Sequence, residues 1–119
     1  MHASQLLELL TTREHVGIVA DMKAVQLVHT RITYSEAAFS ELVLWQVPKP
    51  VTGSDHGFKY RLAYVVLGEC FLRYDNEVGK GDHRHFGGEE SVYSFTTPDQ
   101  LIADFQQDIA RWDDENRNS

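Results

Sequence analysis

Residues 73–85 hold the densest group of side chains that can move protons or bind charge. Their sequence, Arg-Tyr-Asp-Asn-Glu-Val-Gly-Lys-Gly-Asp-His-Arg-His, places two histidines, three carboxylates and three cations within thirteen residues. His83 and His85 are two residues apart, so in an extended backbone they point to one side, while Asp82 and Arg84 point to the other. The two imidazoles can therefore share one site.

These residue types suit cleavage of RNA by its own 2′-hydroxyl, which needs no metal or other cofactor. One group removes the hydroxyl proton, a cation stabilises the phosphorane, and a second group protonates the leaving oxygen. His83 or His85 would be the general acid or base, with Asp75 or Glu77 as the partner that orients a histidine. The predicted substrate contacts are Lys59, Tyr60, Arg61, Arg73, Asn76, Lys80 and Arg84.

Two alternatives stay open on residue types alone. His-x-His is a common two-ligand spacing, so His83 and His85 with Asp82 could hold the metal of a metal-dependent hydrolase. The stretch can also be structural, with Asp75 and Asn76 in a turn and the charges paired on the surface. In that case the protein would be a non-catalytic interaction module that binds another protein.

Length and composition limit the class of protein that carries these residues. With 119 residues, 42% of them apolar and 24% charged, the chain is expected to form a single domain. The net charge of −7 argues against a protein that coats nucleic acid through bulk charge. Neither a membrane span nor a secretory signal is recognised, so we expect a cytoplasmic protein. The single cysteine, Cys70, excludes an intramolecular disulfide and a multi-cysteine zinc site.

Apolar alternation predicts the strands that must position the site. Strands are expected over residues 23–34, 39–47, 58–67 and 70–75, with an edge strand over 92–95. Residues 76–88 contain four glycines and little apolar content, so we expect a loop with at most a short extended piece. Cys70, at a strand start among apolar neighbours, is expected to be a small core residue.

Helix signals complete the predicted fold. Thr97, Pro98 and Gln100 supply an N-cap, a proline at the first helical position and a capping-box partner, so a helix is expected from there to about Trp112. Its apolar stripe would cover the sheet. Residues 4–13 predict a short N-terminal helix. The predicted fold is α+β: an antiparallel meander of four or five strands covered by a C-terminal helix.

Three segments of the sequence resemble the TumE family of toxins. They are Trp45-x-Val47-Pro48-x-Pro50-Val51-x-Gly53-Ser54-x-His56-x-x-Lys59-Tyr60, residues 73–85, and Gln100-Leu101-x-Ala103-Asp104-Phe105. The resemblance covers about residues 22–112. We therefore expect one domain, 1–119, in which residues 1–21 are an N-terminal extension and residues 113–119 a frayed tail.

The resemblance implies a function and a partner. It implies the toxin of a bacterial type II toxin–antitoxin pair, neutralised by a cognate helix-turn-helix antitoxin, with RNA as a substrate by analogy with other small α+β toxins. The matching positions are His56, Lys59, Tyr60, Asp75, Asn76, Glu77, Lys80, Asp82, His83, Arg84 and His85. A sheet edge near Val92 could pair with a second copy, which leaves a homodimer open.

Overall fold

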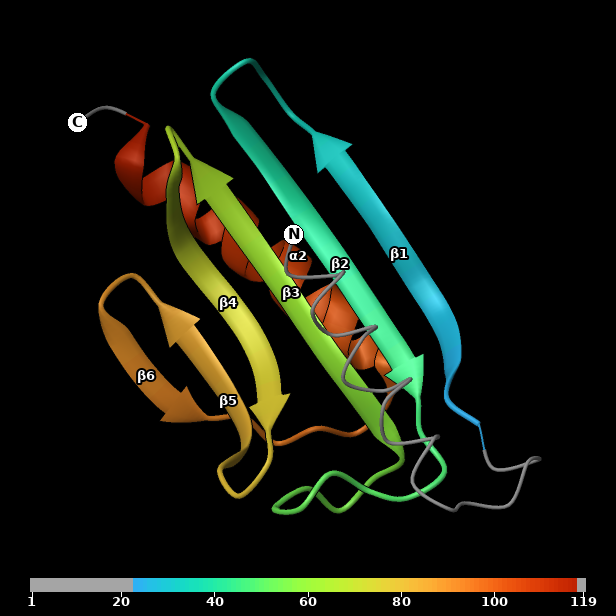
Figure 1. Cartoon of the computed structure of the whole chain (residues 1–119). Coiled ribbons are helices and arrows are strands. Elements are labelled where there is room, and N and C mark those ends of the chain that lie inside the picture. The colour runs from blue at the N-terminus through green and yellow to red at the C-terminus, as the bar shows by residue number, and fades with distance from the viewer. Residues whose placement is uncertain (1–22, 118–119) are drawn as a thin grey trace.

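Six antiparallel strands form one sheet, and a C-terminal helix lies across one of its faces (Figure 1). The computed structural model describes residues 23–117. The strands lie in the sheet in the order in which they follow in the chain, so each pairs with its sequence neighbours. The elements are β1 (Val25–Thr33), β2 (Ala38–Gln46), β3 (Phe58–Val66), β4 (Glu69–Glu77), β5 (Gly81–Phe86), β6 (Glu89–Val92) and α2 (Pro98–Asn116).

The core lies between α2 and the face of the sheet that α2 covers. Alternate residues of the central strands point to this face, as the period of two in a strand requires. The helix meets them with side chains four residues apart, Leu101, Phe105 and Ile109, which lie on one stripe. The buried residues of the core are Ala38, Leu42, Leu44, Tyr60, Leu62, Tyr64, Leu72, Tyr74, Leu101, Phe105 and Ile109.

The start of α2 confirms the capping signal. Thr97 has an extended backbone, and its Oγ1 accepts a hydrogen bond of 3.1 Å from the Gln100 N–H. Pro98 occupies the first helical position, where its missing N–H costs nothing. The helix continues to Asn116, one turn beyond the predicted end near Trp112. The predicted N-terminal helix over residues 4–13 lies outside the described residues.

The prediction of a loop over residues 76–88 is wrong. Gly81–Phe86 forms β5, which pairs with β4 on one side and with β6 on the other. These polar residues form a strand because the ladder of backbone hydrogen bonds supports them from both sides, and no apolar alternation is needed for that. The sheet therefore has six strands in the described part of the chain. The last strand, β6, begins at Glu89, three residues before the predicted edge strand.

The expectation that Cys70 is a core residue is also wrong, because its side chain is exposed. A register shift between Tyr64 and Val65 places Cys70 opposite Val65, on the face away from α2. Within residues 23–117, no helix has the length and apolar character that crossing a membrane would require.

Candidate functional site

Strand β5 divides the predicted site residues between the two faces of the sheet. Asp82 and Arg84 point to the face that α2 covers, because Arg84 pairs with Tyr74 and reaches Asp108 on the helix. His83 and His85 point to the opposite face, which we call the distal face, where their cross-strand partners are Asp75 and Arg73. The predicted alternation is confirmed, and it produces two separate groups of polar side chains.

The first group lies on the distal face around one carboxylate oxygen. Glu90 of β6 places its Oε2 3.1 Å from His83 Nδ1, 3.6 Å from His85 Nε2 and 3.6 Å from Lys80 Nζ. The Glu90 side chain is 41% exposed. We call Arg73, Asp75, Lys80, His83, His85 and Glu90 the distal cluster.

Hydrogen bonds give the two histidines of this cluster different roles. His83 Nε2 lies 2.7 Å from the Lys80 carbonyl, which only accepts, so this nitrogen carries a proton. His85 Nε2 lies 3.0 Å from Arg73 Nη2, which only donates, so this nitrogen presents its lone pair. His83 thus donates a hydrogen bond to a backbone carbonyl, while His85 accepts a hydrogen bond from the Arg73 guanidinium.

Arg73 links the histidines to the buried acid of β4. Its Nε lies 3.3 Å from Asp75 Oδ2, and Asp75 is buried. Arg61 lies across from Asp75 in the register of β3 and β4. Burial lowers the pKa of Arg61, and the nearby Arg73 guanidinium lowers it further. The Arg61 and Arg73 guanidiniums therefore both act near the Asp75 carboxylate on the distal face.

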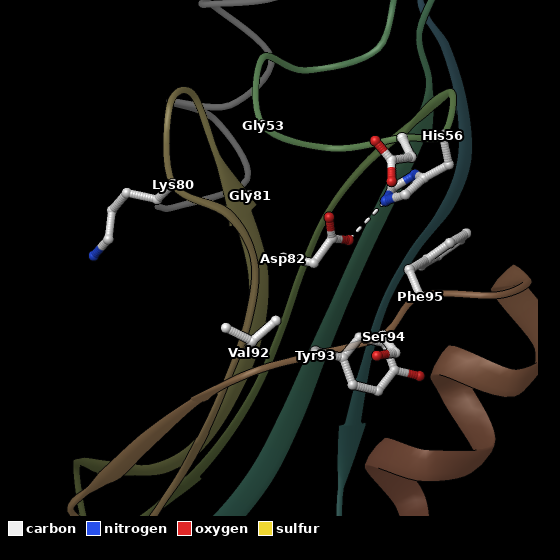
Figure 2. Close-up of a pocket in the computed structure, with 10 residues that line it drawn as sticks. Gly53, His56, Lys80, Gly81, Asp82, Val92, Tyr93, Ser94 and Phe95 are labelled. Carbon is white, nitrogen blue, oxygen red and sulfur yellow. Dashed lines mark hydrogen bonds and ion pairs between the residues drawn. The ribbon is translucent and has the colours of Figure 1, made fainter.

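The second group lies on the covered face and centres on Asp82. Its Oδ1 accepts a hydrogen bond of 2.6 Å from the Ser54 hydroxyl, and its Oδ2 accepts from the Tyr60 hydroxyl at 2.7 Å. His56 Nε2 lies 2.6 Å from the same Oδ2. His56 Nδ1 accepts the Phe58 N–H at 3.2 Å, so the ring proton is on Nε2 and points to Asp82. Figure 2 shows the two side chains facing each other.

Asn76 and Tyr60 fasten this group to the sheet rather than facing a substrate. The Asn76 amide donates to the Phe58 carbonyl at 2.8 Å and to Ser54 Oγ at 3.2 Å, and it accepts the Tyr60 N–H at 3.0 Å. Both side chains are fully buried. Burial raises the pKa of the Tyr60 hydroxyl, and the hydrogen bond to Asp82 raises it further, so Tyr60 remains a donor.

The loop that carries Ser54 and His56 is held against the β4–β5 turn by two glycines. Gly53 and Gly81 both have positive φ, and a Cβ on Gly81 would lie 2.6 Å from the Gly53 carbonyl oxygen. No other residue permits this approach at normal contact distances. Beside this junction lies a cavity of about 350 Å³, lined by both loops and by residues 92–95 (Figure 2).

Arg84 is occupied by the helix. Its Nε lies 2.6 Å from Asp108 Oδ2 and its Nη2 lies 2.9 Å from Oδ1, while the Tyr74 hydroxyl also donates to Asp108 at 2.6 Å. The hydrogen bond to Asp108 is the main cause that raises the pKa of Arg84. This guanidinium therefore joins β5 to α2 and lies on the other face from the two histidines.

The structure thus brings together part of the predicted set. The distal face holds His83, His85, Asp75, Lys80, Arg73, Arg61 and Lys59, the last donating to the Asn76 carbonyl. Glu77 is exposed at the end of β4 and makes no side-chain hydrogen bond to a described residue. Tyr60, Asn76 and Arg84 lie on the covered face. Asp82 does too, so the structure does not assemble His83, His85 and Asp82, and among residues 23–117 no three His, Cys, Asp or Glu side chains are grouped to hold a metal ion.

Sequence reasoning missed Glu90 and gave little weight to His56. The signal for Glu90 was the Gly87-Gly88 pair, because a two-residue hairpin loop there places His85 opposite Glu90. The signal for His56 was its place in the Gly53-Ser54-x-His56 segment, yet its partner Asp82 is 26 residues away. No local pattern reports a contact at that separation.

Comparisons with known proteins place the chain in one family. No curated protein matches it, and no solved structure matches it. A family model described as Toxin TumE matches residues 5–113, which includes most of the predicted extension, although the division of the domain at residue 21 stays a prediction. The chain therefore belongs to the TumE toxin family, which marks it as a toxin of a toxin–antitoxin system with an antitoxin as its partner.

Proposed function

We propose that this toxin cleaves RNA without a metal and that the distal cluster is its active site. The observation that supports the proposal is the convergence of Lys80, His83 and His85 on one oxygen atom of Glu90. A place where the Lys80 ammonium and the His83 ring lie against one carboxylate oxygen also suits a phosphate oxygen, because both are anionic acceptors of similar hydrogen-bond length. The lone pair of His85 beside it is placed to take a proton. Glu90 would then occupy the phosphate position in the free protein.

The position of Glu90 allows it to leave. It lies on β6, a four-residue edge strand whose residues are all exposed, and it is itself 41% exposed. Rotation of its side chain into water costs little, since exposed ion pairs contribute only about 0–1 kcal/mol. An incoming RNA phosphodiester, which carries the same single negative charge, can therefore take its place.

The hydrogen bonds of the two histidines suit opposite steps of the reaction. His85 presents a lone pair and is assigned as the general base that removes the 2′-hydroxyl proton. His83 keeps one proton on Nε2, anchored on the Lys80 carbonyl. In its imidazolium form it carries a second proton on Nδ1, which faces the cluster, and this proton is assigned to the leaving oxygen. Lys80 and Arg73 would stabilise the phosphorane charge, with Asp75 orienting Arg73.

The geometry supports the alternatives less well. A metal-dependent hydrolase built on His83 and His85 lacks the predicted third ligand, because Asp82 points to the other face and is engaged by three donors. A purely non-catalytic module would not explain why two histidines with different proton placement face one carboxylate. Arg84, which the sequence suggested as a phosphate contact, is assigned instead to the structural pair with Asp108.

The test is cleavage of defined RNAs by the purified full chain with and without EDTA. Cleavage that survives EDTA and falls by at least about 100-fold in His83→Ala and His85→Ala is expected, because general acid–base groups contribute about that much or more. His29→Ala is the matched control, since His29 is an exposed histidine on the distal side of β1 and lies outside the cluster. Cleavage that persists in both variants, or that requires a metal, would refute the mechanism.

Glu90→Gln tests the phosphate position separately from chemistry. Removal of the competing charge is expected to tighten binding of a non-cleavable 2′-O-methyl RNA by about three- to tenfold, since one like charge near a surface site contributes about 1 kcal/mol. Binding is measured by fluorescence anisotropy at fixed salt. Unchanged or weaker binding in Glu90→Gln would mean that Glu90 does not occupy the RNA site.

A further inference from the structure

The cavity on the covered side of β5 has a character opposite to that of the distal cluster. Its lining comes from the loop at residues 53–56, from the β4–β5 turn at residues 80–82 and from residues 92–95 (Figure 2). Of its lining residues, only Lys80 takes part in the proposed RNA cleavage, which takes place on the other face of the sheet. We call this space the acidic cavity, for the reasons given next.

Asp82 brings a buried negative charge to the cavity, and its hydrogen-bond donors among residues 23–117 are a serine, a tyrosine and a histidine. Its side chain is only 9% exposed. Its donors are the Ser54 and Tyr60 hydroxyls and the His56 Nε2–H, in a ring whose other nitrogen accepts the Phe58 N–H. All three donors are neutral groups, so they solvate the carboxylate without neutralising it. A carboxylate this buried is usually paired with a positive group.

Asp55 adds a second carboxylate at the rim, and the one cation in the lining points away. Asp55 is exposed and makes no hydrogen bond or ion pair with a described residue. Lys80 directs its ammonium out of the cavity, as Figure 2 shows, toward Glu90 at 3.6 Å. Asp82 also keeps one acceptor position open, because its Oδ1 accepts only the Ser54 hydroxyl. The interior is therefore negative and has room to accept a donor.

A flat aromatic wall completes the cavity. The His56 and Phe95 rings stack with centroids 3.8 Å apart and an interplanar angle of 21°. A guanidinium combines the properties that such a space favours: it is planar, always charged, donates in a fork to carboxylates and stacks on rings. A nucleotide fits less well, since its phosphate would meet two carboxylates.

We propose that the acidic cavity binds the side chain of an arginine from a partner protein. The guanidinium would donate to Asp82 at the base and to Asp55 at the rim, with its plane against Phe95. The volume of about 350 Å³ exceeds what one such side chain needs, so neighbouring backbone of the partner segment would fill the rest. The proposal does not depend on RNA cleavage and can fail or hold independently of it.

The experiment is an NMR titration of the ¹⁵N-labelled full chain with N-acetyl-arginine methylamide. Shifts confined to amides of residues 53–56, 81–82 and 93–95, with a Kd in the millimolar range, are expected for a single side chain. N-acetyl-citrulline methylamide, which has nearly the same shape without the charge, is expected to bind at least about tenfold more weakly. The spectrum itself reports whether each variant is folded.

Two variants and one control make the test decisive. The Asp55 side chain is exposed, so the Asp55→Asn variant should fold. It is expected to weaken arginine binding by about two- to fivefold. Asp82→Asn is expected to abolish it. Glu69→Gln removes an exposed carboxylate at the opposite end of β4 and is expected to change nothing.

Four results would overturn the proposal. If the citrulline probe binds as tightly as the arginine probe, charge does not drive binding. If the arginine probe binds Asp55→Asn as tightly as the unmodified chain, the rim carboxylate takes no part. Shifts of the same amides by guanosine monophosphate but not by the arginine probe would assign the cavity to a nucleotide. If the arginine probe causes no shift at a concentration 50-fold above an expected Kd of about 1 mM, no arginine site exists.

Discussion

Asp108 on α2 accepts three hydrogen bonds from side chains of the sheet, two of them from the Arg84 guanidinium. Its replacement by alanine tests the structural role of Arg84. Arg84 donates to both of its oxygens, at 2.6 and 2.9 Å, and the Tyr74 hydroxyl donates at 2.6 Å. Asp108 is 8% exposed. Asp108→Ala removes the carboxylate from beneath the helix. It leaves Arg84 only its 3.0 Å hydrogen bond to the Tyr74 hydroxyl, and Tyr74 only its 3.5 Å contact with the Asp104 carbonyl.

The expected loss follows from the burial of the partners. Removal of one member of a buried ion pair costs about 3–5 kcal/mol, because the other charge stays behind uncompensated. The Arg84 side chain is 27% exposed and can turn partly to water, so we expect a loss of about 2–4 kcal/mol in the free energy of unfolding. For a domain of this size that corresponds to a fall in Tm of roughly 10–20 °C.

Urea and thermal unfolding followed by circular dichroism measure the loss. Asp114→Ala is the matched control, because Asp114 lies on the same helix but is 72% exposed, and its pair with Arg117 contributes little. Both variants gain the same helix propensity from alanine, so the difference between them isolates the buried pair. A Tm of Asp108→Ala within about 2 °C of the control would refute the reasoning. Arg84 would then be free to serve a substrate.

Two further predictions concern the loop junction and the tyrosines. Gly81→Ala is expected to cost at least about 2 kcal/mol in urea unfolding, because its Cβ would meet the Gly53 carbonyl at a positive φ. Gly68→Ala, also at positive φ but with open space around it, should cost only about 1 kcal/mol, and equal losses would contradict the clash. Burial raises the pKa values of Tyr60 and Tyr74, so the folded chain retains protons that the unfolded chain releases above about pH 10. This contribution is complete below that pH, and the free energy of unfolding should fall as the pH rises above it, with a shallower slope in Tyr74→Phe.

The sequence predicts the apolar part of the fold well, and the reason is periodicity. The strands β1 to β4 lie within two residues of their predicted bounds, because alternating apolar side chains and the breaks around Pro48 and Gly68 mark them directly. The N-cap at Thr97 is equally local. Strand β5 could not be found this way, since its polar residues are supported by pairing on both sides rather than by burial of an apolar face.

For the candidate site, strand alternation predicts on which face of β5 each side chain lies, and nothing more. That alternation placed His83 and His85 together and Arg84 opposite them, and the assignment of Arg84 to a phosphate conflicted with it. The contact that occupies Arg84 comes from Asp108, 24 residues further along the chain. Such a partner depends on how α2 crosses the sheet, which no spacing in the sequence reports.

The two faces of β5 differ in how firmly they are held, and this difference suits a site that must exchange one anion for another. Asp82 ties the strand to the loop at residues 53–56, and Arg84 ties it to α2, so the backbone that carries His83 and His85 is fixed from the covered side. Within the described residues, β6 pairs only with β5, and its side chains are exposed. The two histidines therefore lie on an anchored strand, while Glu90, the anion beside them, lies on a free edge. Glu90 can swing away from the histidines without any change in the core.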